Sequence, residues 1–194
     1  VYIVQYVKKF ISGNWVNVGQ PGFTESYALN TSIVIDDNGT PYVVYIDGYG
    51  AMAGAVTVKK FTAGKWDTVG PRRFSAGRAE APSIAIDKNG TPYVVYKDWT
   101  DNYKTVVKKF TGSSWVDVGN TDHYNIIGVT KLAINNNGVP FIAYYDGTAG
   151  LIRVRKYTMG EWKDIGTFSL PAVGKSTLQI AFNNNGTLYI SYAD

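Results

Sequence analysis

Hydrophobic and polar positions alternate in short runs along the whole chain, and tight-turn sequences separate these runs. In the segment 83–87 (SIAID), Ile84 and Ile86 alternate with small residues, whereas the next segment, 92–97 (PYVVYK), is apolar almost throughout. Alternation with a period of two is typical of a strand with one covered face, and a short continuous apolar run is typical of a strand covered on both faces. The sequence contains no capped segment with the period of a helix. The pattern therefore predicts an all-β protein.

The turns between these runs carry the residues that tight hairpins need. An Asn-Gly pair separates the two segments above and recurs along the chain, at Asn38-Gly39, Asn89-Gly90, Asn137-Gly138 and Asn185-Gly186. Asn and Gly supply the positive φ of a hairpin connection. The segments 36–40 (DDNGT) and 87–91 (DKNGT) superficially resemble calcium loops, but each offers at most two carboxylates, whereas calcium takes about six to eight oxygen ligands. We therefore expect hairpin turns here, and neither a metal site nor a cofactor.

Four landmarks recur together at intervals of 47 to 51 residues. They are the Asn-Gly turn, a basic-basic-aromatic strand, an Asp at the end of an apolar strand, and a tryptophan at the head of another strand. The tryptophans are Trp15, Trp66, Trp115 and Trp162. One full repeat reads as four short strands, at 83–87, 92–97, 105–110 and 115–119. Four-stranded units with a period of about 40–50 residues are the signature of β-propeller blades, which pack face to face because one small sheet cannot bury both of its apolar faces.

The repeat predicts a single β-propeller domain over residues 1–194. Its four blades are expected at approximately 32–70, 83–119, 131–166, and 178–194 completed by 1–19. The chain begins with the third and fourth strands of a repeat and ends with the first and second, so one blade joins the two termini. We expect these terminal strands to close a ring of four blades. The alternative is a ring of eight blades built from two chains, so the protein is expected to be a monomer or a homodimer.

The order of elements within a repeat resembles that of tachylectin-type lectin propellers. A strand that starts with Trp and ends with Gly (WVDVG, 115–119) is followed by a loop, a strand, an Asn-Gly turn and a strand that starts with PY or LY. The resemblance covers all four repeats. It lies in the order of strands and not in sugar-contacting residues. The chain is also similar to propeller repeats of bacterial surface proteins. It implies a non-enzymatic, glycan-binding protein outside the cell or on its surface.

Composition and charge narrow the expected partners. Hydrophobic residues make up 45% and charged residues 18% of the chain, as in a globular domain, and cysteine is absent, which excludes disulfides and thiolate metal sites. The 19 Lys and Arg exceed the 15 Asp and Glu only slightly and are spread through the repeats, so no nucleic-acid partner is predicted. No apolar run approaches the roughly 20 residues that span a bilayer, so no membrane insertion is expected.

Ligand contacts are expected in the long loops before the first strand and after the second strand of each blade, which share one face of the propeller. One aromatic residue recurs there, as Phe23, Phe74, Tyr124 and Phe168. It either stacks on a sugar or fills the gap between neighbouring blades. The aromatics that do not recur are the stronger candidates for ligand contact, and Arg78 is a candidate hydrogen-bond donor. These aromatics are Trp99, Tyr103, Tyr49 and Tyr27.

The aspartate that ends each second strand is a further candidate. The four positions are Asp47, Asp98, Asp146 and Asp194. Their carboxylates either line the axis and accept hydrogen bonds from sugar hydroxyls, or cap their own loops by accepting from backbone N–H groups.

No catalytic residue is predicted. The only histidine, His123, has no partners that would complete a triad. Glu25, Glu80 and Asp101, with Tyr49 or Tyr103, offer the residue types of a glycosidase, but nothing in the sequence singles them out. We expect a non-enzymatic glycan-binding propeller. The alternatives are a protein-interaction or purely structural ring, natural or designed, and a glycosidase or lyase.

Overall fold

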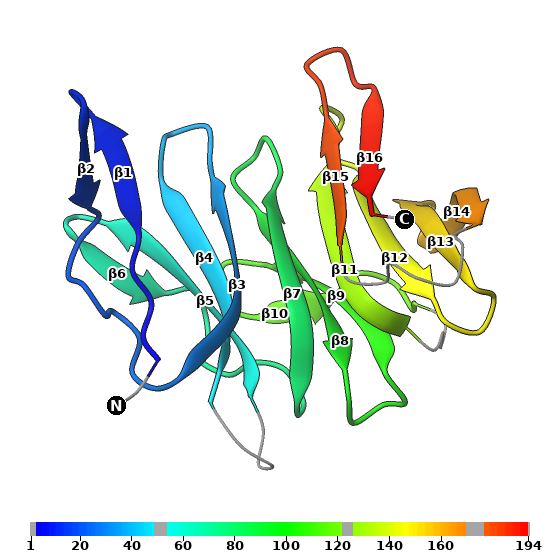
Figure 1. The fold of residues 1–194 in the computed structure, drawn as a ribbon, viewed down its shortest axis with the longest axis horizontal. Coiled ribbons are helices and arrows are strands. Elements are labelled where there is room, and N and C mark those ends of the chain that lie inside the picture. The colour runs from blue at the N-terminus through cyan, green and yellow to red at the C-terminus, as the bar shows by residue number, and fades with distance from the viewer. Residues whose placement is uncertain (1–2, 49–53, 122–125, 170–176, 194) are drawn as a thin grey trace.

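The computed structural model describes residues 3–48, 54–121, 126–169 and 177–193. Within these ranges the chain forms sixteen β-strands and no helix. The strands make five antiparallel sheets that follow one another from the N-terminal to the C-terminal end of an open arc (Figure 1). The predicted all-β class is therefore confirmed.

Three of the sheets are complete four-stranded blades in which each strand pairs with the next one along the chain. Blade I contains β3 (Ala28–Ile35), β4 (Pro41–Asp47), β5 (Ala55–Thr62) and β6 (Lys65–Thr68). Blade II contains β7 (Ala79–Ile86), β8 (Pro92–Asp98), β9 (Lys104–Phe110) and β10 (Trp115–Asp117). Blade III contains β11 (Ile126–Ile134), β12 (Pro140–Asp146), β13 (Leu151–Thr158) and β14 (Glu161–Ser169).

The first strand of each complete blade begins several residues before the predicted position. The strand continues backwards through a bulge, which lies between Leu29 and Ser32 in β3 and between Glu80 and Ser83 in β7. A bulge inserts a residue that breaks the alternation of apolar positions, and this is why the sequence pattern did not reveal these extensions.

The two remaining sheets are half blades of two strands each. The N-terminal half blade contains β1 (Lys8–Ile11) and β2 (Asn14–Asn17), and the C-terminal half blade contains β15 (Leu178–Phe182) and β16 (Leu188–Tyr192). Figure 1 shows the three complete blades between them. Among the described residues β16 does not pair with β1, so the single closed ring of four blades that was the first expectation is not formed. Buried clusters join blade I to blade II and blade II to blade III.

The four Asn-Gly turns have the same hydrogen bonds. In the first, Asp36 Oδ1 accepts from the backbone N–H groups of Asn38 at 2.9 Å and Thr40 at 2.8 Å. Asp87, Asn135 and Asn183 do the same in the other copies. These side-chain oxygens cap the turn, which confirms the predicted hairpins and explains why Asp and Asn exchange at this position.

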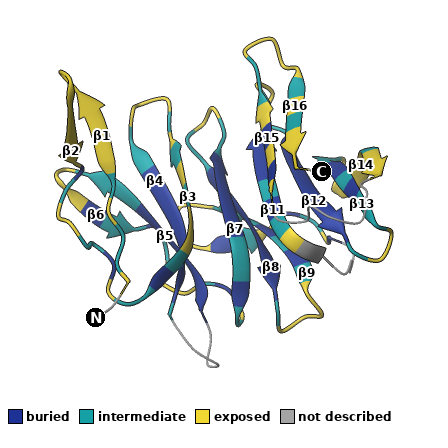
Figure 2. Cartoon of the chain, viewed as in Figure 1, coloured by how far each residue is buried: buried dark blue, intermediate teal, exposed yellow. Residues whose placement is uncertain are grey.

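The hydrophobic core lies between neighbouring sheets. Val44 of blade I and Val94 of blade II belong to one buried cluster, and Val95 of blade II and Ile142 of blade III belong to the next. These residues come from the second strands, whose continuous apolar sequence predicted that both faces are covered. Figure 2 shows the burial concentrated in β4, β8 and β12, while β1 and β2 are exposed and β15 and β16 are partly buried.

The recurring tryptophan fastens each blade to the one before it. The indole N–H groups donate to the carbonyl of the residue that follows the fourth strand of the preceding sheet, Trp66 to Val18 at 2.8 Å, Trp115 to Val69 at 2.9 Å and Trp162 to Val118 at 2.7 Å. A glycine follows each accepting residue, as Gly19, Gly70 and Gly119. A Cβ on these glycines would lie 2.5 to 2.7 Å from an aromatic ring carbon of the next blade, so only Gly fits. The repeated Trp and Gly are thus parts of one contact between blades.

Candidate functional site

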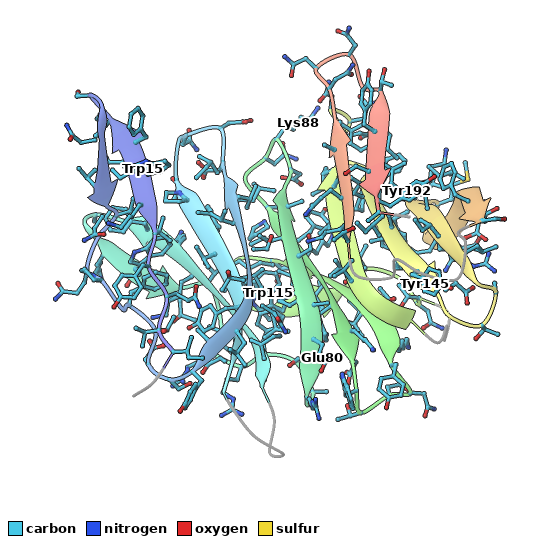
Figure 3. All side chains as sticks on the ribbon, in the orientation of Figure 1. Trp15, Glu80, Lys88, Trp115, Tyr145 and Tyr192 are labelled. Atoms are coloured by element: carbon cyan, nitrogen blue, oxygen red, sulfur yellow. The ribbon has the colours of Figure 1, made fainter. Side chains whose placement is uncertain are left out.

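One end of blade II gathers aromatic and charged side chains from the start of β7, the end of β8 and the loop between β8 and β9. Arg78 immediately precedes β7, Lys97 lies in β8, and Trp99 and Tyr103 occupy the loop between β8 and β9. The backbone N–H of Trp99 donates to the carbonyl of Arg78 at 2.9 Å, which joins the two sides of the site. Figure 3 shows Glu80 near this end of β7, with Lys88 on the Asn-Gly turn at the opposite end. The face is the one on which the sequence placed ligand contacts.

The side chains form a stack of alternating cations and rings. The guanidinium carbon of Arg78 lies 3.7 Å from the centre of the Trp99 ring. The Lys97 ammonium lies 5.6 Å from the Trp99 ring and 4.7 Å from the Tyr103 ring. The two rings meet edge to face, with centres 4.8 Å apart. Cations over aromatic faces are held by the ring quadrupole, so these contacts fix the orientation of both aromatic side chains.

The charged side chains of this cluster differ in exposure: Arg78 and Glu80 form a partly exposed ion pair, whereas Lys97 is buried. Glu80 accepts from Arg78 Nη2 at 3.1 Å, and both side chains remain partly exposed, at 33% and 42%. Lys97 is buried, and this burial lowers its pKa; the carboxylate of Glu80 opposes the shift, and Arg78 adds to it. The indole N–H of Trp99 is buried and has no acceptor among the described residues. The exposed polar groups are therefore Arg78 and Glu80, and the exposed ring is Tyr103.

A hollow of about 440 Å³ adjoins Glu80. It lies among the bulged starts of β3, β7 and β11, and its lining includes Asn30, Glu80 and Thr130. A volume of this size is within the usual range for small-molecule sites. Glu80 therefore connects the aromatic cluster to a polar hollow between blades.

The aromatic cluster is not repeated in blade I. The pairing of Ala79 with Asp98 in blade II corresponds to that of Ala28 with Asp47 in blade I. By this correspondence the positions of Arg78, Lys97 and Trp99 are occupied in blade I by Tyr27, Ile46 and Gly48. The aromatic cluster is thus a local departure from the repeat.

The recurring loop aromatics have a different environment. Phe23 stacks on Trp66 with ring centres 4.3 Å apart, and Phe74 stacks on Trp115 at 4.4 Å. A tryptophan of the next sheet covers one face of each ring, as the gap-filling alternative expects. Phe168 is 38% exposed, with its ring centre 6.4 Å from that of Tyr192. Tyr124 lies outside the described residues.

The aspartates that end the second strands are buried. Asp98 Oδ1 accepts from the Thr100 backbone N–H at 2.8 Å and from its hydroxyl at 2.6 Å. Asp146 Oδ1 accepts from the backbone N–H groups of Thr148 and Ala149, both at 3.0 Å. These are the bonds of the loop-capping alternative. Asp194 and Tyr49 lie outside the described residues.

Asp47 belongs instead to an ionic cluster that the sequence did not reveal. It accepts from the Arg72 guanidinium, from Ser26 at 2.5 Å and from Thr57 at 3.1 Å. Nearby, Glu25 accepts from the buried Lys59 at 2.6 Å. Arg72 follows β6 and does not recur in the repeat, so only the folded chain brings it to Asp47.

Hydrogen bonding keeps these two carboxylates ionised. Burial by itself raises the pKa of Asp47, but the bonds from Arg72, Ser26 and Thr57 outweigh it, and the pKa lies below its usual value. Burial likewise raises the pKa of Glu25, and its bond from Lys59 reverses the shift, so the pKa of Glu25 is also lowered. A general acid in glycoside hydrolysis needs a raised pKa, so Glu25 is poorly suited to that role.

The other carboxylates considered for catalysis are also paired with cations. Glu80 pairs with Arg78 at 3.1 Å, and Asp101 pairs with Lys104 at 3.6 Å. His123 lies outside the described residues. Within the part of the chain that the structure describes, no group of three or more His, Cys, Asp or Glu side chains is placed to hold a metal ion.

The concave side of the arc forms a second hollow, of about 540 Å³. Residues 5–8 and the first strands β3, β7, β11 and β15 line it. Its described lining contains Lys131, whose pKa is lowered by burial, and no carboxylate. Asp47, Asp98 and Asp146 are not part of this lining.

Comparison by sequence gives no family: no protein-family model matches the chain, and no curated protein matches it. Helices able to cross a membrane are likewise not found in the described residues.

Comparison by structure finds β-propellers. The arginine-to-alanine triple mutant of AofleA from Arthrobotrys oligospora superposes with a TM-score of 0.62 and 13% identity over 93% of this chain and 56% of its own. The Aleuria aurantia lectin, solved with alpha-methyl-L-fucoside, superposes with a TM-score of 0.61 and 14% identity over 92% of this chain and 59% of its own. The resemblance to β-propeller lectins is thus confirmed for the fold.

Glycosidases share the fold as well. An exo-beta-1,3-galactanase from Clostridium thermocellum superposes with a TM-score of 0.59 and 10% identity over 98% of this chain and 45% of its own. This chain therefore spans less than two thirds of the length of all three proteins. At these identities the likeness concerns the arrangement of sheets and not the chemistry.

Proposed function

We propose that this protein is a non-enzymatic, lectin-like propeller that binds a glycan at the end of blade II, around Arg78, Glu80, Trp99 and Tyr103. The observation that carries the proposal is the partly exposed Arg78–Glu80 pair beside the Trp99–Tyr103 pair. A sugar presents hydroxyl groups along its edge and apolar C–H groups on its face. A fixed aromatic ring beside a charged donor and a charged acceptor matches both features.

The roles of the side chains follow from their exposure. Tyr103 is 37% exposed and offers its ring to the apolar face of the sugar. Arg78 donates to sugar hydroxyls, and Glu80 accepts from them at the mouth of the adjoining hollow. Lys97 lies beneath both rings and holds them in place. The residues predicted to bind ligand that belong to this site are Arg78, Trp99 and Tyr103, while Glu80 is an addition.

Two observations support a binding protein over an enzyme. Two of the compared structures are lectins, and one of them was solved with a fucoside. In addition, the three carboxylates considered for a glycosidase each pair with a cation. A glycan-binding propeller would meet its ligand outside the cell or on a cell surface.

A glycan array followed by calorimetry on the best ligand tests the proposal. We expect Arg78→Ala and Tyr103→Ala each to weaken binding at least about tenfold, since each removes a charged hydrogen bond or a stacking surface. Lys88→Ala, on the opposite face of the same blade, is the matched control and should bind as the wild type does. Failure to bind any glycan would overturn the proposal and favour a protein-interaction or structural ring. Turnover of chromogenic glycosides would favour a glycosidase.

A further inference from the structure

The first strands of the sheets bring one position of the repeat to the concave hollow of about 540 Å³. In every sheet the residue at this position pairs with the same position of the second strand, which is Val44, Val95, Ala143 or Ser191. The residues themselves form what we call the first-strand row, Ser32, Ser83, Lys131 and Gln179, and all of them line the hollow. Their strands, β3, β7, β11 and β15, follow one another across the middle of the arc (Figure 1). The fold thus gathers four polar side chains around one hollow.

Lys131 is the charged member of this row. Burial lowers the pKa of its ammonium group, as expected for a cation that is partly withdrawn from water. Among the described residues the lining of the hollow holds no carboxylate, and Lys131 takes part in none of the ion pairs. A cation withdrawn from water without a counter-charge is costly. The charge of Lys131 therefore favours an anion in the hollow.

The nearest candidate for a counter-charge on the chain is already engaged. Glu80 and Lys131 both border the smaller hollow of about 440 Å³. Glu80 accepts from Arg78 Nη2 at 3.1 Å, and burial is the cause that shifts the pKa of Lys131. Lys8 also lines the concave hollow and adds a second, exposed cation. The described lining is therefore positive on balance.

Two hydrogen bonds between blades hold the backbone on either side of Lys131. The Thr130 hydroxyl donates to the carbonyl of Ala81 at 2.9 Å, and the backbone N–H of Leu132 donates to Ser83 Oγ at 3.3 Å. Thr130 is 1% exposed and Ser83 is 4% exposed, so both bonds are shielded from water. The segment that carries the cation is thus fixed to blade II before any ligand arrives, which lowers the entropic cost of binding.

The neutral members of the row are hydrogen-bond donors. A hydroxyl that accepts one bond can still donate its own hydrogen, so Ser83 can donate into the hollow as well as accept from Leu132. Ser32 offers a second hydroxyl and Gln179 an amide NH₂ group. An oxyanion accepts several hydrogen bonds at once, and bonds to a charged acceptor are about twice as strong as those between neutral groups. The row therefore combines one charge partner with several donors for the same oxyanion.

We propose that the concave hollow binds a small oxyanion, which is a phosphate, sulfate or carboxylate group. Lys131 supplies the charge, and Ser32, Ser83 and Gln179 supply hydrogen bonds. The hollow has room for more than one such group, so the oxyanion is either a free ion or part of a small organic molecule. The site is separate from the proposed glycan site, because Arg78, Trp99 and Tyr103 do not line this hollow. A bound oxyanion would contact four sheets at once and would stabilise the arc.

Calorimetry with inorganic phosphate, at an ionic strength held constant with sodium chloride, gives the first test. We expect the wild-type chain to bind phosphate and Lys131→Met to weaken this binding at least about tenfold, because it removes a charged hydrogen-bond donor. Lys131→Arg keeps the charge and should bind. Lys88→Met makes the same change of charge at an exposed lysine on an Asn-Gly turn, and as the matched control it should bind as the wild type does. Equal phosphate affinity in Lys131→Met and the wild type would overturn the proposal.

Thermal denaturation gives the second test. Phosphate should raise the Tm of the wild type and of Lys88→Met and leave that of Lys131→Met unchanged. Circular dichroism shows whether each variant has folded, and Lys131→Gln is the second variant should Lys131→Met not fold. Loss of phosphate binding in Arg78→Ala would place the ion at the end of blade II and would overturn the proposal.

The choice of probe distinguishes the two sources of the oxyanion. Sulfate, acetate and a sugar phosphate are compared with inorganic phosphate on the same chain. Tighter binding of the sugar phosphate, lost in Lys131→Met, would support an organic ligand. Equal or tighter binding of a free ion, lost in the same variant, would support the ion itself. A hollow that holds only water would give neither heat nor stabilisation with any of the four probes, and this result would overturn the proposal.

Discussion

Trp115 and Trp15 hold the same position of the repeat, yet their surroundings are opposite. Trp115 is 9% exposed, donates to Val69 at 2.9 Å and stacks on Phe74, whereas Trp15 is 65% exposed. Both lie in strands that pair with a basic-basic-aromatic strand in the same register, Trp115 with Phe110 and Trp15 with Phe10. The local structure is therefore the same, and the difference comes from the neighbouring sheet.

This comparison separates two contributions to the fold. Pairing within a blade depends on the repeat itself, because the hairpin turns and the strand sequences are present in every copy. Burial depends on a preceding blade that supplies a carbonyl, a glycine and an aromatic side chain. Repeat proteins show this division generally, because each unit contacts only its neighbours.

The largest expected effect is that of Trp115→Ala. It removes a buried indole, its hydrogen bond and its stack on Phe74, and should lower the free energy of unfolding by about 3–5 kcal/mol. Trp15→Ala, at a 65% exposed side chain, should change it by less than about 1 kcal/mol when both are measured by urea denaturation. Equal losses at the two positions would contradict the comparison.

Gly119→Ala is expected to have the second-largest effect on the free energy of unfolding. The residue has φ 68° and its Cβ would lie 2.5 Å from Tyr157, so strain and overpacking should cost about 1–3 kcal/mol. Gly166→Ala, at the same position of the repeat, meets no such contact and should cost less than about 1 kcal/mol. Thermal denaturation of both variants measures the difference.

The ionic cluster of Glu25, Asp47, Lys59 and Arg72 joins the loop after the N-terminal half blade to blade I. It predicts that the free energy of unfolding depends on pH. The pKa values of Asp47 and Glu25 are lowered on folding, so their contribution to stability is fully present above their unfolded values of 3.8 and 4.5. It is lost as the pH falls through the lower folded values. We therefore expect the unfolding free energy to drop steeply below about pH 4, and Asp47→Asn to flatten this drop. Arg72→Met removes the main donor and should flatten it too; an unchanged slope in both variants would show that the cluster contributes nothing.

The smallest expected effect on the free energy of unfolding is that of Lys97→Met at the end of blade II. Lys97 is a buried cation without a carboxylate within ion-pair distance among the described residues. An apolar side chain of similar length should therefore change the unfolding free energy by less than about 1 kcal/mol, in either direction. It should still weaken glycan binding, since the cation holds Trp99 and Tyr103 in place. Calorimetry beside denaturation separates the two effects, and unchanged binding would remove Lys97 from the proposed site.

Part of the candidate site could be predicted from the sequence. Trp99 and Tyr103 were selected because they break the repeat, and the structure brings them together with Arg78. The sequence indicated Glu80 only as a catalytic carboxylate, because β7 reaches back to Glu80 across a bulge that interrupts the alternation of apolar positions. The ionic cluster of Asp47, Arg72 and Glu25 could not be predicted from the sequence, because its members come from distant segments and only Asp47 recurs in the repeat.

The sequence by itself determined the strands, their hairpin turns and the four-stranded blade, because these depend on alternation, on Asn-Gly turns and on residues close together in the chain. Only the tertiary structure decided how the blades fit together. It assigned the repeated Trp and Gly to the contact between blades, buried the aspartates in their loops and left the two half blades apart. The angle between packed sheets sets the curvature of the arc, and it arises from many side chains acting together, so no repeat encodes it separately.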